Sequence, residues 1–569
     1  MSSFDWCIVI LINGAIIAFG LWKAYGTKRA VDWFLAGKGL PWWIVGLSMF
    51  ATAVDSGDYV AVAGAAYRNG MSYISPWWLG LTIGWITVAY VVLLPMYRTG
   101  MFTNAEYLEY RFGPVTRIIS VLIQIQYRTN VLANVAYSLY LTFSILTDWG
   151  TQTWWLVVAV ACGAAAYTAS GGLKSVAITD AAQSVVMVVA SLVLWFTVFT
   201  AIGGWNGFEQ RLAKAEVDQK VANAMLHVGG HLETGVPPSL VLVGWIVFLT
   251  AYCVVNHSQA MRMLSCRSEW DIKMAAVMAA SLTAGVMWFN VTLGILGRAV
   301  FPDLGSGDQI FPLLVREFLL PMQMGLTGIV VAGLLAGGIS TYDSIGSAVS
   351  AVFTRDLYAR FFVKYADDRH YLRVSRLATF AVIGVSFVYV PFLEDGMVRL
   401  YVKLVGVTAV PLLTVYMMGI LTPVHRLSGS VGLIVGVTSG ISRLLNSPLG
   451  LGLPLQWTNE WWGCLWSILL TAVAMLVTTL LFGWADPKEI AGLVYRSHRN
   501  VKSKPTALSL RRIEATKDTW IERSLEDMPQ MPAYPFSVPA SGLPWYKRPL
   551  IWTGLLIGIV SFLNLVAFW

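Results

Sequence analysis

The sequence predicts an all-α polytopic membrane protein with about fourteen transmembrane helices. The chain has 569 residues, of which 57% are hydrophobic and 12% are charged, and its mean hydropathy is +0.64. A soluble protein of this length would carry about 25% charged residues. The apolar residues also gather in runs of roughly 20, the length at which a helix crosses the hydrocarbon core of a bilayer. Together these observations exclude a soluble globular protein.

The apolar runs define the helices in order. The second is interrupted at Asp55–Asp58, and the polar segment Thr103–Gly113 connects the third run to the fourth. The predicted spans are Phe4–Tyr25, Trp43–Tyr67, Ser75–Met96, Val115–Leu146, Trp154–Thr168, Val176–Ile202, Leu240–Val255, Met274–Val300, Met322–Val352, Leu377–Phe392, Val402–Ile420, Ser430–Ile441, Trp462–Phe482 and Leu550–Phe568.

Basic residues mark one side of the predicted membrane. The segments after the first and third helices are basic, as are those that contain Arg262 and Arg267 and the stretch Lys488–Arg548, whereas short loops on the other side hold few bases. By the positive-inside bias, both termini lie outside and the linker is cytoplasmic. The net charge of +8 therefore follows from topology and predicts no nucleic-acid partner. We expect a multi-pass protein of a cell membrane, and specifically of a bacterial inner membrane.

The same pattern predicts a cytoplasmic linker at 485–548 and a C-terminal transmembrane helix at 549–569. The five cysteines have no paired spacing, which predicts neither a disulfide framework nor a zinc site. No nucleophile, phosphate loop or redox motif indicates an enzyme. The oligomeric state is left open.

Ionisable residues lie in or near several apolar runs, where lipid should exclude them. A charge at the centre of a bilayer costs about 2.5–3.5 kcal/mol, so such residues usually face a cavity, a partner or an ion path. Several of them together predict a protein that moves a polar or charged species. The residues are Asp55, Asp58, Arg128, Asp180, Asp343 and Lys403.

The interrupted second helix is the first candidate site. Gly57 and the short acidic residues Asp55 and Asp58 favour local unwinding in mid-span. Unwound backbone is tolerated at that depth where it lines a cavity or meets an ion. The alternative is that the two carboxylates lie near an interface and merely end a helix.

Two further segments carry candidate cation ligands. In Gly337–Ser344, the hydroxyls of Ser340, Thr341 and Ser344 share one helical face, and hard cations such as Na⁺ prefer oxygen ligands. Small and hydroxylated residues also serve close helix packing in membranes. In Gly171–Gln183, Asp180 is a candidate cation ligand or a carboxylate that the dipole of its own helix stabilises.

The segment Gly171–Gln183 resembles the signature of the solute:sodium symporter family, the family of sodium/glucose cotransporter-like proteins. The stretches Phe34–Lys38, Glu106–Gly113 and Phe353–Tyr358 are similar to other landmarks of that family, in family order. The resemblance implies a LeuT-like core of two inverted five-helix repeats, with extra helices at the termini. We therefore expect an N-terminal extra helix and connector at 1–40, the ten-helix core at 41–426 and two extra helices at 427–484. No internal sequence similarity between the two repeats is visible.

The resemblance also implies where cations bind. The family's sodium site falls on the backbone carbonyls of Ala51, Val54 and Gly337 and on the hydroxyls of Ser340 and Thr341. Members with a second sodium use positions that match Asp180, Asp343 and Ser344. The chain departs from the pattern at Asp343, where a hydroxyl is usual, which leaves the number of coupled cations open. Apart from sodium, we expect no metal.

The substrate positions depart further from the sugar-carrying members. Asp58 matches an amide residue, Lys403 matches a glutamine, and Asn256 matches an asparagine that an aromatic gate residue usually follows, here replaced by Ser258. In sialic-acid-type members, an arginine on the helix that carries Arg128 meets the substrate carboxylate. The expected substrate-binding residues are Asp55, Asp58, Gln124, Arg128, Asn256 and Lys403.

These residues leave two roles open for the basic side chains. Arg128 is a good bidentate partner for a substrate carboxylate. Alternatively, Arg128 and Lys403 neutralise the buried carboxylates within the protein. We expect a sodium-coupled symporter in the bilayer that imports a small polar organic solute, an organic anion or sugar acid first and a neutral sugar or polyol second. A protein of another class, a transporter-like sensor without net transport, is the further alternative.

Overall fold

The computed structural model describes residues 1–24, 39–101, 103–170, 173–214, 219–229, 236–393, 396–450, 452–495 and 543–569. The family-like stretch Phe34–Lys38, the pair Gly171–Gly172 and most of the 485–548 linker lie outside the described residues.

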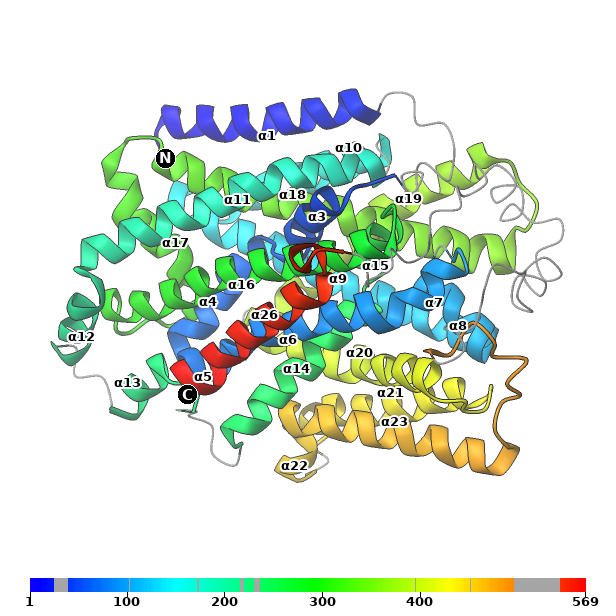
Figure 1. Cartoon of the computed structure of the whole chain (residues 1–569). Coiled ribbons are helices and arrows are strands. Elements are labelled where there is room, and N and C mark those ends of the chain that lie inside the picture. Colours follow the sequence, from blue (N-terminus) through cyan, green and yellow to red (C-terminus); the bar gives the residue numbers. More distant parts are fainter. Residues whose placement is uncertain are drawn as a thin grey trace.

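The described residues fold into one bundle of helices that run along a common direction (Figure 1). The regular structure described is helical, apart from an isolated bridge between Leu40 and Cys266. The helices before residue 230 are α1 (Ser3–Ala24), α3 (Trp42–Ala53), α4 (Ser56–Asn69), α5 (Met71–Ile74), α6 (Pro76–Thr87), α7 (Leu93–Arg98), α8 (Asn104–Phe112), α9 (Pro114–Thr147), α10 (Thr153–Ser170), α11 (Leu173–Ile202), α12 (Gly204–Lys214) and α13 (Gln219–Leu226). The remaining helices are α14 (Pro238–Val255), α15 (His257–Leu264), α16 (Glu269–Val300), α17 (Ile310–Leu314), α18 (Leu326–Val352), α19 (Asp368–Ser386), α20 (Met397–Leu421), α21 (Ser428–Leu449), α22 (Leu455–Thr458), α23 (Glu460–Phe482) and α26 (Pro549–Phe562).

The order of the long helices agrees with two five-helix repeats. The first repeat consists of the interrupted helix α3/α4, the span built from α5, α6 and α7, and then α9, α10 and α11. The second consists of the interrupted helix α14/α15, followed by α16, α18, α19 and α20. Each repeat therefore begins with a broken helix, and α18 of the second repeat packs against both α3 and α11 of the first.

By length and composition, twelve helices among the described residues can span a membrane. The two other predicted spans correspond to the interrupted helix α3/α4 and to α10. The multi-pass helical fold is thus confirmed, while the count of fourteen stays a prediction.

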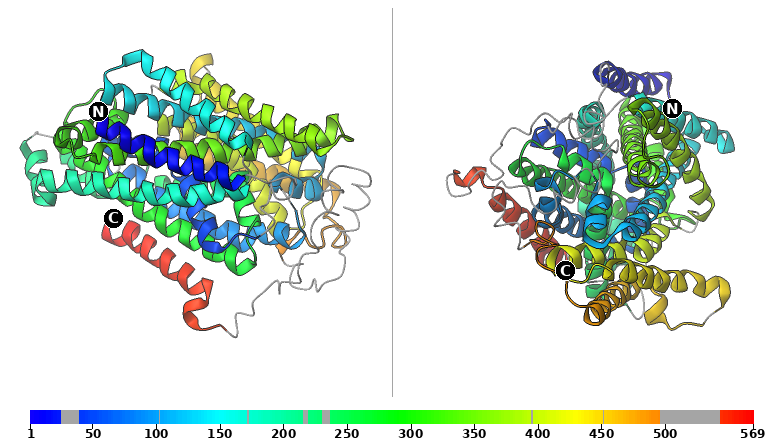
Figure 2. Two further views of the ribbon diagram at one scale, coloured as in Figure 1. Left: turned by 90° about the horizontal axis from the view of Figure 1, so that it is seen from above. Right: turned by 90° about the vertical axis from the view of Figure 1, so that its right-hand side faces the viewer.

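Both chain ends lie at the same end of the bundle (Figure 1). The terminal amino group of Met1 donates to the Leu146 carbonyl (3.5 Å), and the Val228 amide donates to the Phe568 carbonyl (2.6 Å). The C-terminal helix α26 runs along the outside of the bundle (Figure 2). This arrangement agrees with the prediction that the two termini share one side.

Three polar segments differ from their predicted structure. The predicted connector Thr103–Gly113 contains the helix α8, which Thr103 caps by accepting from the Glu106 amide (3.1 Å). Most of α8 is buried. Its Arg111 donates to the carbonyls of Gly419, Thr422 and Val424, which holds α8 against the end of α20. The long polar loop after α11 contains α12 and α13. Arg262, predicted in a cytoplasmic loop, lies on α15 and is fully buried.

Candidate functional site

The interruption of the second predicted helix is confirmed, and its acidic residues form it. Helix α3 ends at Ala53, and Val54 and Asp55 have extended backbones. The Asp55 carboxylate accepts from the Asp58 amide, and the Asp58 carboxylate accepts from the Asp55 amide, both at 3.1 Å. This reciprocal capping starts α4 and satisfies its first free N–H groups. The carboxylates therefore end one helix and begin the next, and they also line a cavity inside the protein, while their role in binding stays a prediction.

The predicted sodium-binding groups converge on the contact between this break and α18. The Asp55 amide donates to Asp58, so it no longer donates to the Ala51 carbonyl as it would in a continuous helix. A methyl group on Gly337 would lie 3.4 Å from the Ser56 amide nitrogen and 3.5 Å from the Asp55 carbonyl carbon, so the α18 backbone touches the break.

The hydroxyls that complete this predicted site lie on the next turn of α18. Ser340 donates to Asp180 (2.7 Å), and the fully buried Thr341 hydroxyl has no hydrogen-bond partner among the described residues. Free carbonyls and an unpartnered hydroxyl are the oxygen ligands that a hard monovalent cation prefers. The chemistry of these groups suits sodium, and the binding role of Ala51, Val54, Gly337, Ser340 and Thr341 stays a prediction.

The predicted second cation site contains a protein cation. The Arg262 guanidinium donates to Asp180 (2.8 Å) and also to Ser344, and its Nε donates to the Ser48 hydroxyl (2.7 Å). Arg262 further donates to the Ser258 carbonyl (2.8 Å). Both members of the Asp180–Arg262 ion pair are completely buried. Arg262 thus joins two of the three residues that were expected to hold a second cation.

The third of these residues, Asp343, is held separately. One carboxylate oxygen accepts from the Thr168 hydroxyl (2.6 Å), and the other is buried without a partner among the described residues. Asp343 therefore makes no described ion pair with Arg128 or Arg262, and its cation-binding role stays a prediction.

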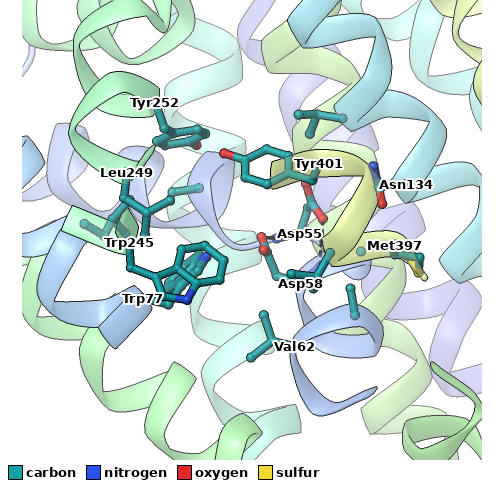
Figure 3. Close-up of a pocket in the computed structure, with 16 residues that line it drawn as sticks. Asp55, Asp58, Val62, Trp77, Asn134, Trp245, Leu249, Tyr252, Met397 and Tyr401 are labelled. Carbon is teal, nitrogen blue, oxygen red and sulfur yellow. Dashed lines mark hydrogen bonds between the residues drawn. The ribbon is translucent and has the colours of Figure 1, made fainter. Parts of the chain in front are cut away.

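A central cavity lies beside the break, on the side of the termini. It has a volume of about 60 Å³, on the order of four water molecules. Asp55 and Asp58 are the charged side chains among its described lining residues, and Asn134 adds an amide. Figure 3 shows the Asp58 carboxylate directed into the space between aromatic side chains. The aromatic residues of the wall are Trp77, Trp245, Tyr252 and Tyr401.

Arg128 lies behind this aromatic wall. Its guanidinium carbon is 5.5 Å from the Tyr127 ring centroid and 5.7 Å from that of Tyr252, which lines the cavity. One guanidinium nitrogen donates to the Ser258 hydroxyl (3.4 Å), while Nε and the other terminal nitrogen are buried without an acceptor in the described part of the chain. Arg128 attracts Asp55 and Asp58 electrostatically but makes no ion pair with them among the described contacts.

A second break lies next to Arg128. Helix α14 ends at Val255, and Asn256 caps α15 by accepting from the Ser258 amide (3.1 Å). The amide nitrogen of Asn256 is buried without a partner among the described residues. Gln124 lies one turn before Arg128 on α9 and donates to Asn104 (3.2 Å). The structure therefore groups Gln124, Arg128 and Asn256 at the second break and the two aspartates at the first.

Lys403 does not line the central cavity. Its ammonium group is 3.8 Å from Glu460, and it lines a separate cavity between α20 and α23. Its role in binding substrate has no support from this position.

Sequence reasoning missed Arg262 and the tyrosines of the cavity wall. Arg262 follows Ser258 by four residues, on the same helical face, and that spacing after a polar interruption was the available signal. Tyr252 and Tyr401 belong to apolar runs, in which no pattern separates a cavity-lining ring from a packed one.

Comparisons with known proteins agree with this arrangement. The model of the sodium:solute symporter family matches residues 33–436. Sodium/glucose cotransporter 4 of Danio rerio is 27% identical over 485 residues, which cover 78% of this chain and 72% of the relative. Sodium/myo-inositol cotransporter 2 of Mus musculus is 28% identical over 480 residues, which cover 78% of this chain and 70% of the relative.

Solved structures share the fold. The substrate-bound outward-open state of a Na⁺-coupled sialic acid symporter has a TM-score of 0.71 at 20% identity and covers 85% of this chain and 99% of its own. A nucleobase-cation-symport-1 family transporter, with bromovinylhydantoin bound, has a TM-score of 0.50 at 14% identity and covers 81% and 97%. The predicted LeuT-like core is thus confirmed. The chain is a multi-pass membrane protein for sodium-coupled solute transport, and it belongs to the sodium:solute symporter family.

Proposed function

We propose that this symporter imports a small zwitterionic solute, one that carries both a carboxylate and an amino or quaternary ammonium group. The observation that carries the proposal is the separation of charge between the two helix breaks. The first break presents Asp55 and Asp58 to the central cavity. The second break holds Arg128 behind the tyrosine wall of that cavity, with two guanidinium nitrogens that have no acceptor among the described residues. The earlier expectation of an organic anion or sugar acid uses only the second of these features.

The first break is unsuited to an anion. The N-terminus of a half-helix carries a partial positive charge and free N–H groups, which in many transporters face an anionic substrate group. Here the N-terminus of α4 is already occupied, because Asp55 and Asp58 cap it. A second anion 5 Å from one of these carboxylates would meet a repulsion of about 3 kcal/mol at an effective dielectric constant of about 20.

A positively charged group gains from the same features. The attraction to each carboxylate has the same size with opposite sign. Faces of Trp and Tyr rings add roughly 0.5–2 kcal/mol to the binding of a cation that loses its water. Trp77, Trp245, Tyr252 and Tyr401 supply such rings around the acidic pair.

The second break suits the carboxylate. Its half-helix α15 has a neutral cap, Asn256, and Arg128 donates to Ser258 within the first turn. The free Nε and terminal nitrogen of Arg128 match the two oxygens of a carboxylate. In this conformation Tyr127 and Tyr252 lie against the guanidinium, so the tyrosine layer must rearrange as the solute enters.

Sodium acts on the same break. Bound between the free carbonyls of α3 and the hydroxyls of α18, the ion would hold the two helices together. Gly337 touches the backbone at Asp55 and Ser56, so this contact also fixes the carboxylates that line the cavity. Sodium binding therefore favours the conformation that accepts the solute, which is the thermodynamic requirement for coupling.

A neutral polyol is the second candidate, because a relative is named for myo-inositol and carboxylates accept hydrogen bonds from hydroxyl groups. A sensor without net transport is the alternative of another class. The buried hydroxyl of Thr341, which has no partner among the residues described, favours transport over sensing, since a sensor has no need of a sodium ligand.

Uptake into proteoliposomes tests the proposal. The probes are alanine and glycine betaine as zwitterions, gluconate as a sugar acid, myo-inositol as a polyol and choline as a cation, each with and without an inward sodium gradient. We expect sodium-driven accumulation of a zwitterion, which Arg128→Gln and Asp58→Asn each reduce at least tenfold. Arg316→Gln, at an exposed residue outside the described lining of the cavity, is the control.

Each other result has a defined meaning. Accumulation of gluconate or myo-inositol alone contradicts the zwitterion and returns the solute to one of the earlier classes. Accumulation of no probe, by protein that binds one of them, supports a sensor.

A further inference from the structure

A second cavity lies between α20, α21, α22 and α23, on the side of the bundle opposite α1 (Figure 1). Its volume is about 310 Å³, several times that of the central cavity. Its charged lining residues among those described are Arg399, Lys403, Arg443 and Glu460. We call this space the basic cavity.

The basic cavity has an excess of positive charge. Glu460 is the one acidic residue of its described lining, and it is 3.8 Å from both Arg399 and Lys403. At that distance and with 65% and 39% of their side chains exposed, these bases are weakly paired. Arg443 has no described carboxylate partner, so the cavity carries two uncompensated positive charges.

Arg443 is held by two described contacts and has a further N–H donor group available. One terminal nitrogen donates to the Ser467 hydroxyl (2.5 Å), and the guanidinium lies 5.7 Å from the Trp457 ring centroid. The other terminal nitrogen is buried without an acceptor among the described residues. A buried charged donor without a partner is costly, and a bound acceptor would remove that cost.

The side-chain oxygens of the two asparagines in the cavity are already engaged as acceptors. Asn446 accepts from the Leu453 amide (3.0 Å), and Asn459 caps α23 by accepting from the Trp461 amide (3.0 Å). Gly463 leaves room beside Arg443, because a methyl group there would approach its Nε to 3.0 Å. The hydrogen-bonding capacity left at these asparagines and at the bases therefore consists of donors, which suit an anion.

The membrane side of this cluster is also unusual. The ends of α20, α21 and α23 that carry these residues lie on the side of the termini, which the charge pattern places outside. Bases are scarce on that side of membrane proteins. Three of them around one cavity call for an anionic partner.

We propose that the basic cavity binds a small oxyanion, a carboxylate or a phosphate group. Two sources supply this chemistry on the outer side, a dissolved anion and the headgroup of an anionic phospholipid. The site is distinct from the central cavity, although both share α20. Met397 and Tyr401 face the central cavity, and Lys403 and Arg399 face the basic one. An anion bound there would thus act on a helix that forms the wall of the solute cavity.

Two binding measurements on the full-length protein test the site and distinguish its sources. The first is equilibrium binding of inorganic phosphate to protein purified in neutral detergent. The second counts lipids by native mass spectrometry after reconstitution in nanodiscs of phosphatidylglycerol and phosphatidylcholine. Phosphate binding supports a dissolved anion, and selective retention of phosphatidylglycerol supports the lipid. Failure of both overturns the proposal.

Variants separate a binding site from general surface charge. Lys403→Gln and Arg443→Gln should each weaken anion binding about tenfold. Glu460→Gln should strengthen it, because it releases both exposed bases. Gly463→Leu should abolish it without changing any charge, and Arg316→Gln should leave it unchanged. If Glu460→Gln weakens binding as Lys403→Gln does, the cluster is a structural ion network and the proposal fails, even where Arg443→Gln does not fold.

Discussion

Replacing Arg262 with glutamine should turn a closed ion pair into a sodium site. In the native protein the guanidinium donates to Asp180, Ser344, Ser48 and the Ser258 carbonyl, all within the buried contact of α3, α11, α15 and α18. Glutamine retains part of this hydrogen bonding but removes the positive charge. Asp180 then loses its described cationic partner and keeps the hydroxyl donors Ser48 (2.6 Å) and Ser340 (2.7 Å).

The cost of this change is that of breaking a buried pair. Removing one partner of a buried salt bridge destabilises a protein by about 3–5 kcal/mol, because the remaining charge is left without compensation. Such a loss corresponds to roughly 10²- to 10⁴-fold in the equilibrium constant for unfolding. Asp180→Asn should cost a similar amount, since it leaves the guanidinium unpaired. The double variant should be more stable than the sum of the two single losses predicts.

Sodium should restore part of the lost stability in Arg262→Gln. The vacated space is surrounded by the Asp180 carboxylate and the hydroxyls of Ser48, Ser340 and Ser344, which are hard oxygen ligands. Thermal unfolding in detergent, with sodium titrated against choline chloride, measures this effect. The variant should show a larger sodium-dependent rise in melting temperature than the native protein, and the sodium dependence of its uptake should become steeper.

Two outcomes would refute this reasoning. A variant as stable as the native protein without sodium would show that Arg262 does not compensate the Asp180 charge. A variant that is destabilised but gains no more from sodium than the native protein would show that the space cannot hold the ion. Lys174→Gln, at an exposed base on α11, is the matched control for loss of a positive charge.

Three further predictions test the sodium contact, the helix packing and the ion pairs of Glu109. Thr341→Val should raise the sodium concentration needed for half-maximal uptake at least tenfold with little change in melting temperature, because it removes a free buried hydroxyl; an unchanged requirement would remove Thr341 from the site. Gly294→Ala should destabilise the protein by about 1–3 kcal/mol, since its methyl group would lie 2.1 Å from the Ala63 carbonyl oxygen, whereas Gly285→Ala, with open space around it, should be near neutral in thermal unfolding. Burial acts to raise the pKa of Glu109, but Arg117 and Arg360 outweigh it and hold that pKa below its ordinary value. The stability that Glu109 provides is therefore present above the ordinary glutamate pKa and is lost as the pH falls through the lowered pKa. Glu109→Gln should accordingly reduce the fall of the melting temperature at acid pH.

The first break could be predicted from the sequence, whereas the second could not. At the first, two aspartates and a glycine interrupt an apolar run, and each of these residues disfavours a continuous helix in lipid. At the second, the run ends at Val255 and the polar residues that follow look like an ordinary exit from the membrane. Only the packing of α15 against α3 and α18 shows that the chain turns back into a helix there.

The charged residues show the same limit of sequence reasoning. The positive-inside bias counts a base next to an apolar run as a loop residue, so it placed Arg262 in the cytoplasm. It could not register that Asp180, 82 residues earlier, supplies the partner that makes burial possible. For Lys403, family position indicated the substrate, but the side chain lies on the face of α20 that turns away from the central cavity. The position of a residue along a helix shows which cavity its side chain faces only when the neighbouring helices are known.

The charge at the first break gives the sharpest test of solute selection. Asp58→Asn retains a side-chain oxygen that can accept from the Asp55 amide, so α4 should keep its cap. It removes one of the two negative charges that face the cavity. The penalty for an anionic ligand should fall by about 3 kcal/mol and the gain for an ammonium group should fall equally. In competition uptake, the variant should lose affinity for the zwitterion and become more sensitive to an analogue that has the carboxylate but no amine. If the variant instead loses both to the same degree, Asp58 serves the fold of the break alone, and the charge of the solute must be determined elsewhere.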